Sequence, residues 1–183
     1  MVLAPRDLAG CEHRLALDFA HPELVRDRPD TPGVSRRKEA AAAHRARVRE
    51  LLRGIHSDQP ESFVVVDAAD SATRARQTMQ ACADGARWIW NATLPVDAEH
   101  GRRGHAELLI AHGDGYVPVI VVNHRTTQPA KKPPREADAR PTTVVTSPLW
   151  AWAPGPDPHR TIRPNRRDSL RLEHLTAMLV ELG

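Results

Sequence analysis

The chain has 183 residues, an apolar fraction of 40% and a formal net charge of only +3. This length fits one domain with a real core, so we expect a single domain over residues 1–183. Charges in the first segment exclude a secretory signal, and no apolar run approaches a membrane span. We therefore expect a soluble, cytoplasmic protein that does not enter a membrane. We leave open that the chain is the N-terminal part of a longer protein.

Two cysteines, Cys11 and Cys82, lie far apart and form no CxxC pair. This spacing favours reduced thiols and gives no signature of a structural zinc site. Four cysteine ligands would be needed for an iron–sulfur cluster, so we expect none.

The first half of the chain predicts helices around one strand. Segment 5–20 has apolar residues at helical spacing, and segment 35–55 has them at intervals of three and four. The second helix is predicted to bury one face with His44 on it and Arg45 and Arg49 beside it; its other members are Ala41, Val48, Leu51 and Ile55. A strand follows in "SFVVVDA", and then a helix that starts at Asp70 or Ser71 and stops at Gly85.

The second half predicts strands, a long loop and a final helix. "RWIWNATLPV" alternates as a strand does, and "GHAELLIAH" and "YVPVIVVNH" form a hairpin that turns at Gly113, Asp114 and Gly115. Residues 126–165 are rich in proline and predict a long loop with one short strand around "TTVVTSPLWAW". "RDSLRLEHLTAMLVELG" predicts a terminal helix. This order predicts an α/β fold with a mixed central β-sheet flanked by helices.

The order of "DLAGCEHRLALD", the helix with His44, "GHAELL", "YVPVIVVNH" and "DSLRLEHLTAMLVELG" resembles the RecB-type branch of the PD-(D/E)XK nuclease superfamily. The resemblance implies a restriction-endonuclease-like fold and a setting in DNA repair or recombination. In that family a His and an Asp bind Mg²⁺ or Mn²⁺, an acid-x-Lys pair follows on the second hairpin strand, and the last helix adds a Gln and a Tyr. The metal polarises the phosphate and acidifies water, and the Lys positions the hydroxide.

Carried over by position, His44 matches the family His, and Glu107 stands in place of the Asp. The second acid falls on Ile120 and the Lys on Val122, neither of which can bind a cation or polarise water. The Gln and Tyr positions hold Arg171 and Leu175. The resemblance therefore implies an eroded catalytic centre with little or no nuclease activity, in which His44 and Glu107 bind a metal weakly or not at all.

The helix predicted over residues 35–55 is rich in basic residues. Between Gly33 and Arg53 there are seven basic residues and two acids, which favours a polyanionic partner. We expect DNA phosphates, single- or double-stranded, to contact cations of this helix, of the loop and of the last helix: Arg45, Arg49, Arg53, Lys131, Lys132, Arg166, Arg167 and Arg171.

Two alternatives stay open beside a DNA-binding domain. One is an active metal-dependent DNA nuclease with a rearranged site, in which His124 or Arg171 takes over a missing role. The other is a scaffold that binds a helicase or another repair protein, which the proline-rich loop favours.

Overall fold

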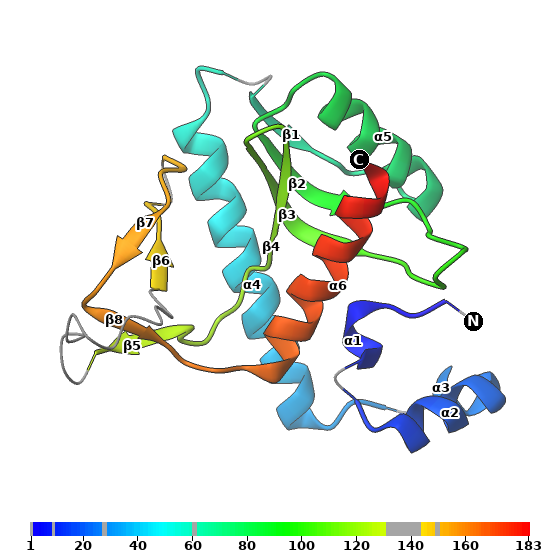
Figure 1. Ribbon diagram of the computed structural model, residues 1–183. Helices are drawn as coiled ribbons and strands as arrows, with labels where there is room; N and C mark the ends of the chain where they lie inside the picture. The colour runs from blue at the N-terminus through cyan, green and yellow to red at the C-terminus, as the bar shows by residue number, and fades with distance from the viewer. Residues whose placement is uncertain (1, 9, 27–28, 60–61, 131–143, 149–150) are drawn as a thin grey trace.

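The computed structural model describes residues 2–8, 10–26, 29–59, 62–130, 144–148 and 151–183. Figure 1 shows the elements in place. In chain order they are α1 (Pro5–Leu8), α2 (Glu12–Ala20), α3 (Pro22–Arg26), α4 (Pro32–Ile55), β1 (Phe63–Val65), α5 (Ser71–Ala83), β2 (Trp88–Thr93), β3 (His105–His112), β4 (Gly115–Val119), β5 (Thr127–Pro129), β6 (Val144–Thr146), β7 (Gly155–Asp157), β8 (Arg160–Ile162) and α6 (Arg166–Leu182).

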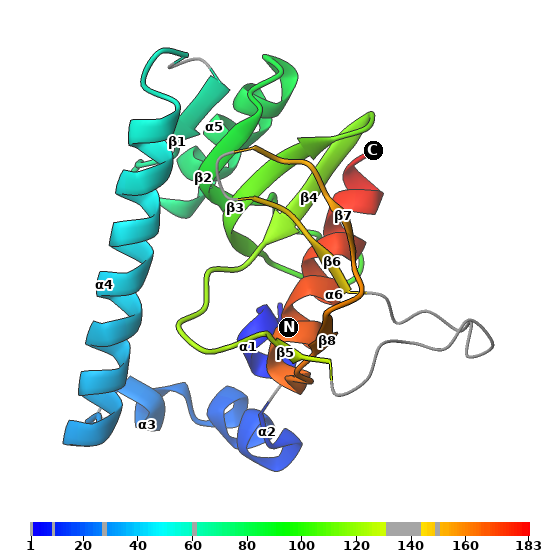
Figure 2. The ribbon, with the colours of Figure 1, turned by 90° about the vertical axis from the view of Figure 1, so that its left-hand side faces the viewer.

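The centre of the fold is a four-stranded sheet in the order β1-β2-β3-β4 (Figure 2). β1 runs parallel to β2, and α5 makes the crossover that a parallel pair requires. β2, β3 and β4 are antiparallel neighbours, and the predicted hairpin turns at Gly113 and Asp114, where Gly113 has a φ of 60°. The predicted α/β class with a mixed central sheet flanked by helices is confirmed.

Helices cover both faces of this sheet (Figure 2). On one face Leu52 of α4 packs with Trp88, Trp90 and Leu108. On the other face, which α5 and α6 cover, Ile89 and Leu109 belong to a second cluster with Ala81, Leu175 and Met178. Burying a large apolar side chain contributes about 1.5–3 kcal/mol, so these two clusters are the main favourable term that holds the layers together.

The ends of α5 and α6 follow the predicted signals. The Asp70 carboxylate accepts a hydrogen bond from the backbone N–H of Thr73 at 2.8 Å, and Gly85 after the helix has a φ of 74°. Asn165 caps α6 by accepting from the N–H groups of Arg167 and Asp168. Each side-chain cap satisfies N–H donors that the first helical turn leaves free.

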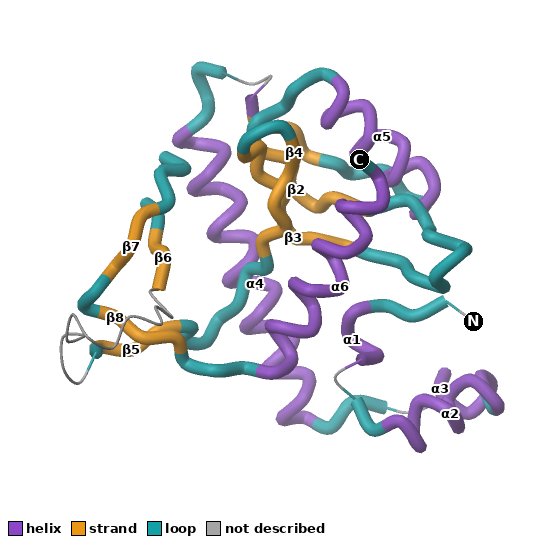
Figure 3. The backbone as a smooth tube through the Cα atoms, viewed as in Figure 1, coloured by secondary structure: helices purple, strands orange, loops and turns teal. Residues whose placement is uncertain are grey.

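Two predicted segments need correction. The helix expected over 5–20 is two helices, because Cys11 is extended and breaks it. The segment 126–165 is more ordered than a loop: β5 pairs with β8 and β6 pairs with β7 as two antiparallel ribbons (Figure 3), although residues 131–143 and 149–150 lie outside the described residues. β6 confirms the short strand predicted around "TTVVTSPLWAW", whereas β5, β7 and β8 were not predicted, because these three-residue strands show no apolar alternation.

The buried face of α4 also differs from the prediction. Leu51 and Ile55 are 51% and 41% exposed, whereas Leu52 is fully buried. From Ala41 onward, the side chains with reduced exposure on this helix are Ala41, His44, Arg45, Val48, Arg49 and Leu52. This inward stripe repeats every three or four residues, so it forms one helix face. The true face is rotated by about one residue, and it includes two arginines that the apolar pattern had placed beside it.

One residue locks the strands where the sheet is irregular. Asn91 of β2 has a φ of 62°, and the register of β2 and β3 has bridging pairs on both sides of it but none at Asn91 itself. Its amide nitrogen donates to the Val66 carbonyl at 2.6 Å, and its Oδ1 lies 2.8 Å from Nε2 of His105. Asparagine is among the few residues that tolerate a positive φ.

We predict that Asn91→Ala lowers the free energy of unfolding by about 2–3 kcal/mol, because it removes two hydrogen bonds and strains the backbone. Asn91→Gly should cost about 1 kcal/mol less than the alanine variant, since glycine adopts positive φ freely. Urea denaturation of both variants measures the difference. Equal stability of the alanine and glycine variants would contradict the role given to the backbone.

A second prediction concerns pH. The ring of His56 lies 5.0 Å from that of Trp88, and burial, aided by the charge of Arg87, lowers the pKa of His56 below its usual 6.5. The folded state therefore binds a proton less readily than the unfolded chain. The stability contributed is complete above pH 6.5 and is lost as pH falls through 6.5 towards the lowered pKa.

The thermal midpoint should accordingly fall between about pH 7.5 and pH 5.5, and His56→Gln should reduce that fall. Differential scanning fluorimetry at the two pH values tests both statements. A midpoint that rises on acidification would show that other groups outweigh His56.

Candidate nucleic-acid interface

The centre of the candidate site is an ion pair between β3 and α6. Glu107 is 8% exposed, and Nη2 of Arg171 lies 3.0 Å from each of its two carboxylate oxygens. α6 packs closely against Gly104, near the start of β3. A Cβ atom on Gly104 would lie 2.8 Å from the side chains of Leu175 and Met178, so the glycine lets the helix approach the sheet. Arg171 is one helical turn before Leu175, so α6 carries it over β3.

The hairpin partner of Glu107 offers no second acid. Leu108 pairs with Val119, which is the last residue of β4. Because the two strands are antiparallel, the next position along the chain places Ile120 across from Glu107. The prediction that this strand runs on through His124 is wrong, since β4 ends at Val119. Ile120 packs against the core on the α5 and α6 side, and Val122 follows it as a half-buried aliphatic residue.

These residues do not fit a divalent cation. Both oxygens of Glu107 already bind a guanidinium, and the place of the expected second acid is aliphatic. Within the described ranges no cluster of three or more His, Cys, Asp or Glu side chains is placed to hold a metal ion. His44 is half-buried on the inward stripe of α4, where its helix neighbour is Arg45. The geometry at Glu107 is that of an ion pair between protein groups.

Arginines from three helices influence the pKa of His105 on β3. His105 bonds to Asn91 and keeps part of its surface exposed. Burial lowers the pKa of His105, and Glu107 acts in the opposite direction. Three arginines lower the pKa further, one each from α5, α6 and α4: Arg74, Arg171 and Arg45. The sequence had suggested Arg45 and Arg171, whereas Arg74, His105 and Asn91 were missed because no motif marks them.

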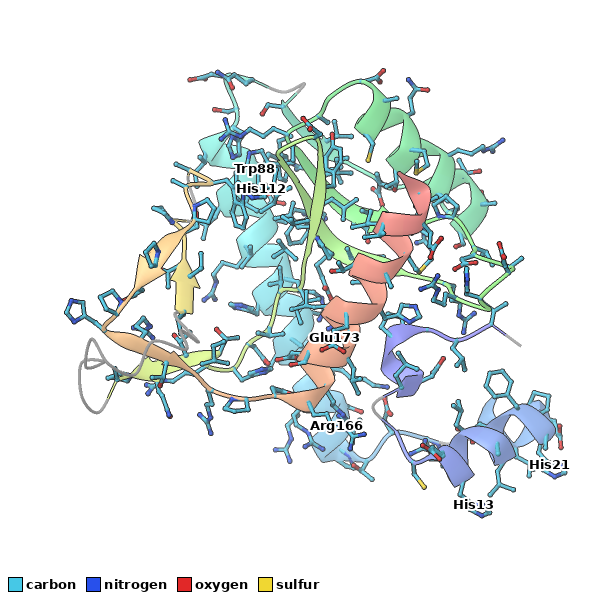
Figure 4. The ribbon with its side chains drawn as sticks, in the orientation of Figure 1. His13, His21, Trp88, His112, Arg166 and Glu173 are labelled. Atoms are coloured by element: carbon cyan, nitrogen blue, oxygen red, sulfur yellow. The ribbon has the colours of Figure 1, made fainter. Side chains whose placement is uncertain are left out.

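The other predicted cations lie farther from this pair or are engaged elsewhere. Nε of Arg49 lies 3.0 Å from Glu50, and Arg53 approaches the same carboxylate at 3.7 Å. Arg166 and Arg167 are exposed in the first turn of α6, where Figure 4 shows Arg166 at the lower end of the helix. Lys131 and Lys132 lie outside the described residues. The site as described therefore centres on α4, β3 and α6.

His124 was considered for a missing catalytic role, but it contacts the start of α6. Its Nε2 lies 2.7 Å from the Asp168 carboxylate and 3.0 Å from the amide nitrogen of Asn165. Both residues belong to the start of α6, so His124 ties the segment after β4 to that helix. This contact gives His124 a structural role at the helix start.

Two pockets lie elsewhere on the molecule. One, of about 790 Å³, runs along α5 and is closed on the other side by Leu94, Pro95 and Val96. The second, of about 440 Å³, lies between β1 and the later half of α5. Neither includes Glu107 or Arg171.

Comparison with family models, with curated proteins and with solved structures finds no significant match to this chain. In the part of the chain that the structure describes, no helix is both long and apolar enough to span a membrane.

The ion pair makes a prediction about stability. Arg171→Met should lower the free energy of unfolding by about 2 kcal/mol, because it leaves Glu107 buried without its cation, and the partial exposure of Arg171 keeps the loss below that of a fully buried pair. Adding Glu107→Gln should recover much of the loss, because no uncompensated charge remains. Chemical denaturation of the two variants measures this coupling, and a double variant less stable than Arg171→Met would contradict it.

Proposed function

We propose that this chain is a DNA-binding domain with a RecB-nuclease-like fold and an eroded catalytic centre. It contacts backbone phosphates and does not read base sequence. The observation that carries the proposal is the inward stripe of α4, where His44 and Arg45 are held half-buried in line with Val48 and Leu52, which pack against the sheet. An arginine of intermediate exposure can bury its aliphatic stem on such a face while its guanidinium stays accessible to an anion.

Guanidinium groups suit phosphate. Their planar forks donate two parallel hydrogen bonds to phosphate oxygens, and contacts of this kind fix position without sequence information. No carboxylate lies within ion-pair distance of Arg45 among the described residues, and Arg45 acts on the same β3 histidine as Arg171. Arg166 and Arg167 extend the positive charge along α6.

The eroded centre is supported by the residues around Glu107. Arg171 engages both carboxylate oxygens, and Ile120 follows at the place where the resemblance implies an acid. Losing a metal-held hydroxide and a positioned base would each cost about 10²- to 10⁴-fold in rate. Binding without cleavage is therefore the function that these residues favour over a rearranged nuclease site.

A second candidate is a scaffold for a helicase or another repair protein. The pocket along α5 favours it, because Met79 and Val96 give it an apolar lining with Arg76 among its few polar groups. Such pockets are common sites for partners or small ligands. A partner that stays bound after nuclease treatment would support this function over direct DNA binding.

DNA binding by this chain should depend steeply on salt. The logarithm of the affinity should fall with the logarithm of salt concentration, with a slope near −0.9 for each phosphate neutralised. Arg45→Gln should weaken binding of all sequences alike and make the slope shallower by about one. Fluorescence anisotropy with labelled single- and double-stranded DNA measures both.

Arg76→Gln is the matched control, because it removes the same charge from α5 outside the candidate interface and should leave the slope unchanged. Absence of binding at low salt, or binding that ignores salt, would overturn the proposal.

A further inference from the structure

Helices α2 and α3, which span residues 12–26, form an arm that stands apart from the sheet (Figures 1 and 2). No residue of α2 is buried, and the described members of the two core clusters include none from the arm. Three large apolar side chains of the arm, those of Leu17, Phe19 and Leu24, are 47%, 42% and 63% exposed. Helices of nine and five residues are marginal in water without tertiary packing. Within the described part of one chain, much of the apolar surface of the arm therefore stays in water.

The pocket of about 790 Å³ along α5, the α5 groove, is a second apolar surface that solvent reaches. Helix α5 forms one wall and the segment 94–96 forms the other. Most of the lining side chains are apolar: Ala72, Ala75, Met79, Leu94, Pro95 and Val96. Val96 is 58% exposed, so this lining is open to a partner.

The arm has apolar side chains where an occupant of this groove needs them. An element that enters between two apolar walls needs apolar groups on more than one side. Leu17 and Phe19 lie two positions apart on α2, and residues at this spacing point in different directions from a helix. Leu24 adds a third apolar group from α3.

The charges of the two surfaces are complementary. Arg76 is the only charged residue among the described residues that line the groove; its Nη2 lies 3.0 Å from the Thr73 hydroxyl, and no described carboxylate pairs with it. On the arm, Glu12 is exposed in the first turn of α2 and forms no ion pair with a described residue. The other acids of the arm pair with its own bases, as Arg14 with Asp18 and His21 with Glu23. An unpaired acid on the arm therefore matches an unpaired arginine in the groove.

The arm and the groove lie on the same side of the molecule. Figure 1 shows α5 at the upper right and α2 and α3 at the lower right. A two-fold axis between these two places would bring the arm of each copy to the groove of the other, so one symmetric contact covers both surfaces twice. Helix α4 packs on the opposite face of the sheet from α5, so its basic residues stay outside this contact.

We propose that two copies of this chain form a symmetric dimer in which the arm of each copy occupies the α5 groove of the other. Leu17, Phe19 and Leu24 leave water in this dimer, and removal of apolar surface from water is its driving force. Glu12 is the group that faces Arg76. This inference goes beyond DNA binding, because it involves neither α4 nor the ion pair of Glu107 and Arg171, and it fills the groove with this chain in place of a repair protein.

Sedimentation equilibrium of the whole chain, from micromolar to millimolar concentration, measures the oligomeric state. The proposal predicts a monomer–dimer equilibrium that shifts to the dimer as the concentration rises. A chain that stays monomeric over the whole range would overturn it and would leave the groove open to a different protein.

Variants locate the contact. Phe19→Glu in the arm and Val96→Lys in the groove each change a side chain that is exposed in the single chain, so both variants should fold, which thermal denaturation checks. Each should raise the dissociation constant of the dimer at least about tenfold, because the dimer would bury an unpaired charge in an apolar groove. Leu51→Glu, at an exposed residue of α4, is the matched control and should leave the constant unchanged. A dimer that neither Phe19→Glu nor Val96→Lys weakens would refute the contact.

A mixture of the two variants tests whether arm meets groove. The Val96→Lys chain supplies a natural arm and the Phe19→Glu chain supplies a natural groove, so a mixed dimer recovers one of the two contacts. The mixture should therefore associate more tightly than either variant does alone. A mixture that associates no better than the separate variants would contradict the exchange of arms.

Discussion

The ion pair of Glu107 and Arg171 is the interaction on which the candidate site depends. It joins the middle of the central sheet to α6 and neutralises a carboxylate that is almost wholly buried. Such a carboxylate is costly to bury without a partner, so the position of α6 and the state of the site are coupled. The close approach of α6 at Gly104 and the cap at Asn165 both serve the same placement of the helix.

The ion pair changes how the carboxylate on the β3–β4 hairpin is interpreted. A carboxylate on the first strand of a hairpin suggests a metal ligand, but here a guanidinium takes both oxygens and an aliphatic residue follows on the other strand. Under the proposed function, Arg171 supplies a positive charge where the resemblance implies a metal ion. A protein cation of this kind can attract phosphate, but it does not acidify water as a metal ion does.

Much of the sheet could be predicted from local patterns, because β2, the β3–β4 hairpin and α5 carry strong signals in alternation, turn residues and caps. The inward stripe of α4 was harder, since Leu51 and Leu52 are equally apolar and only packing selects Leu52. The pairing of Glu107 with Arg171 spans 64 residues, and no local pattern encodes such a contact. Asn91 was missed for the same reason: its φ and its two bonds depend on strands distant in sequence.

We propose that the site binds DNA without cleaving it, and one paired experiment tests this proposal. The same labelled single- and double-stranded DNAs are assayed for mobility shift and for cleavage, with Mn²⁺ and with EDTA. We predict a mobility shift of similar affinity in both conditions and intact DNA throughout. Cleavage that requires Mn²⁺ and disappears in Glu107→Gln would contradict it, because Glu107 would then act on a metal and not on Arg171.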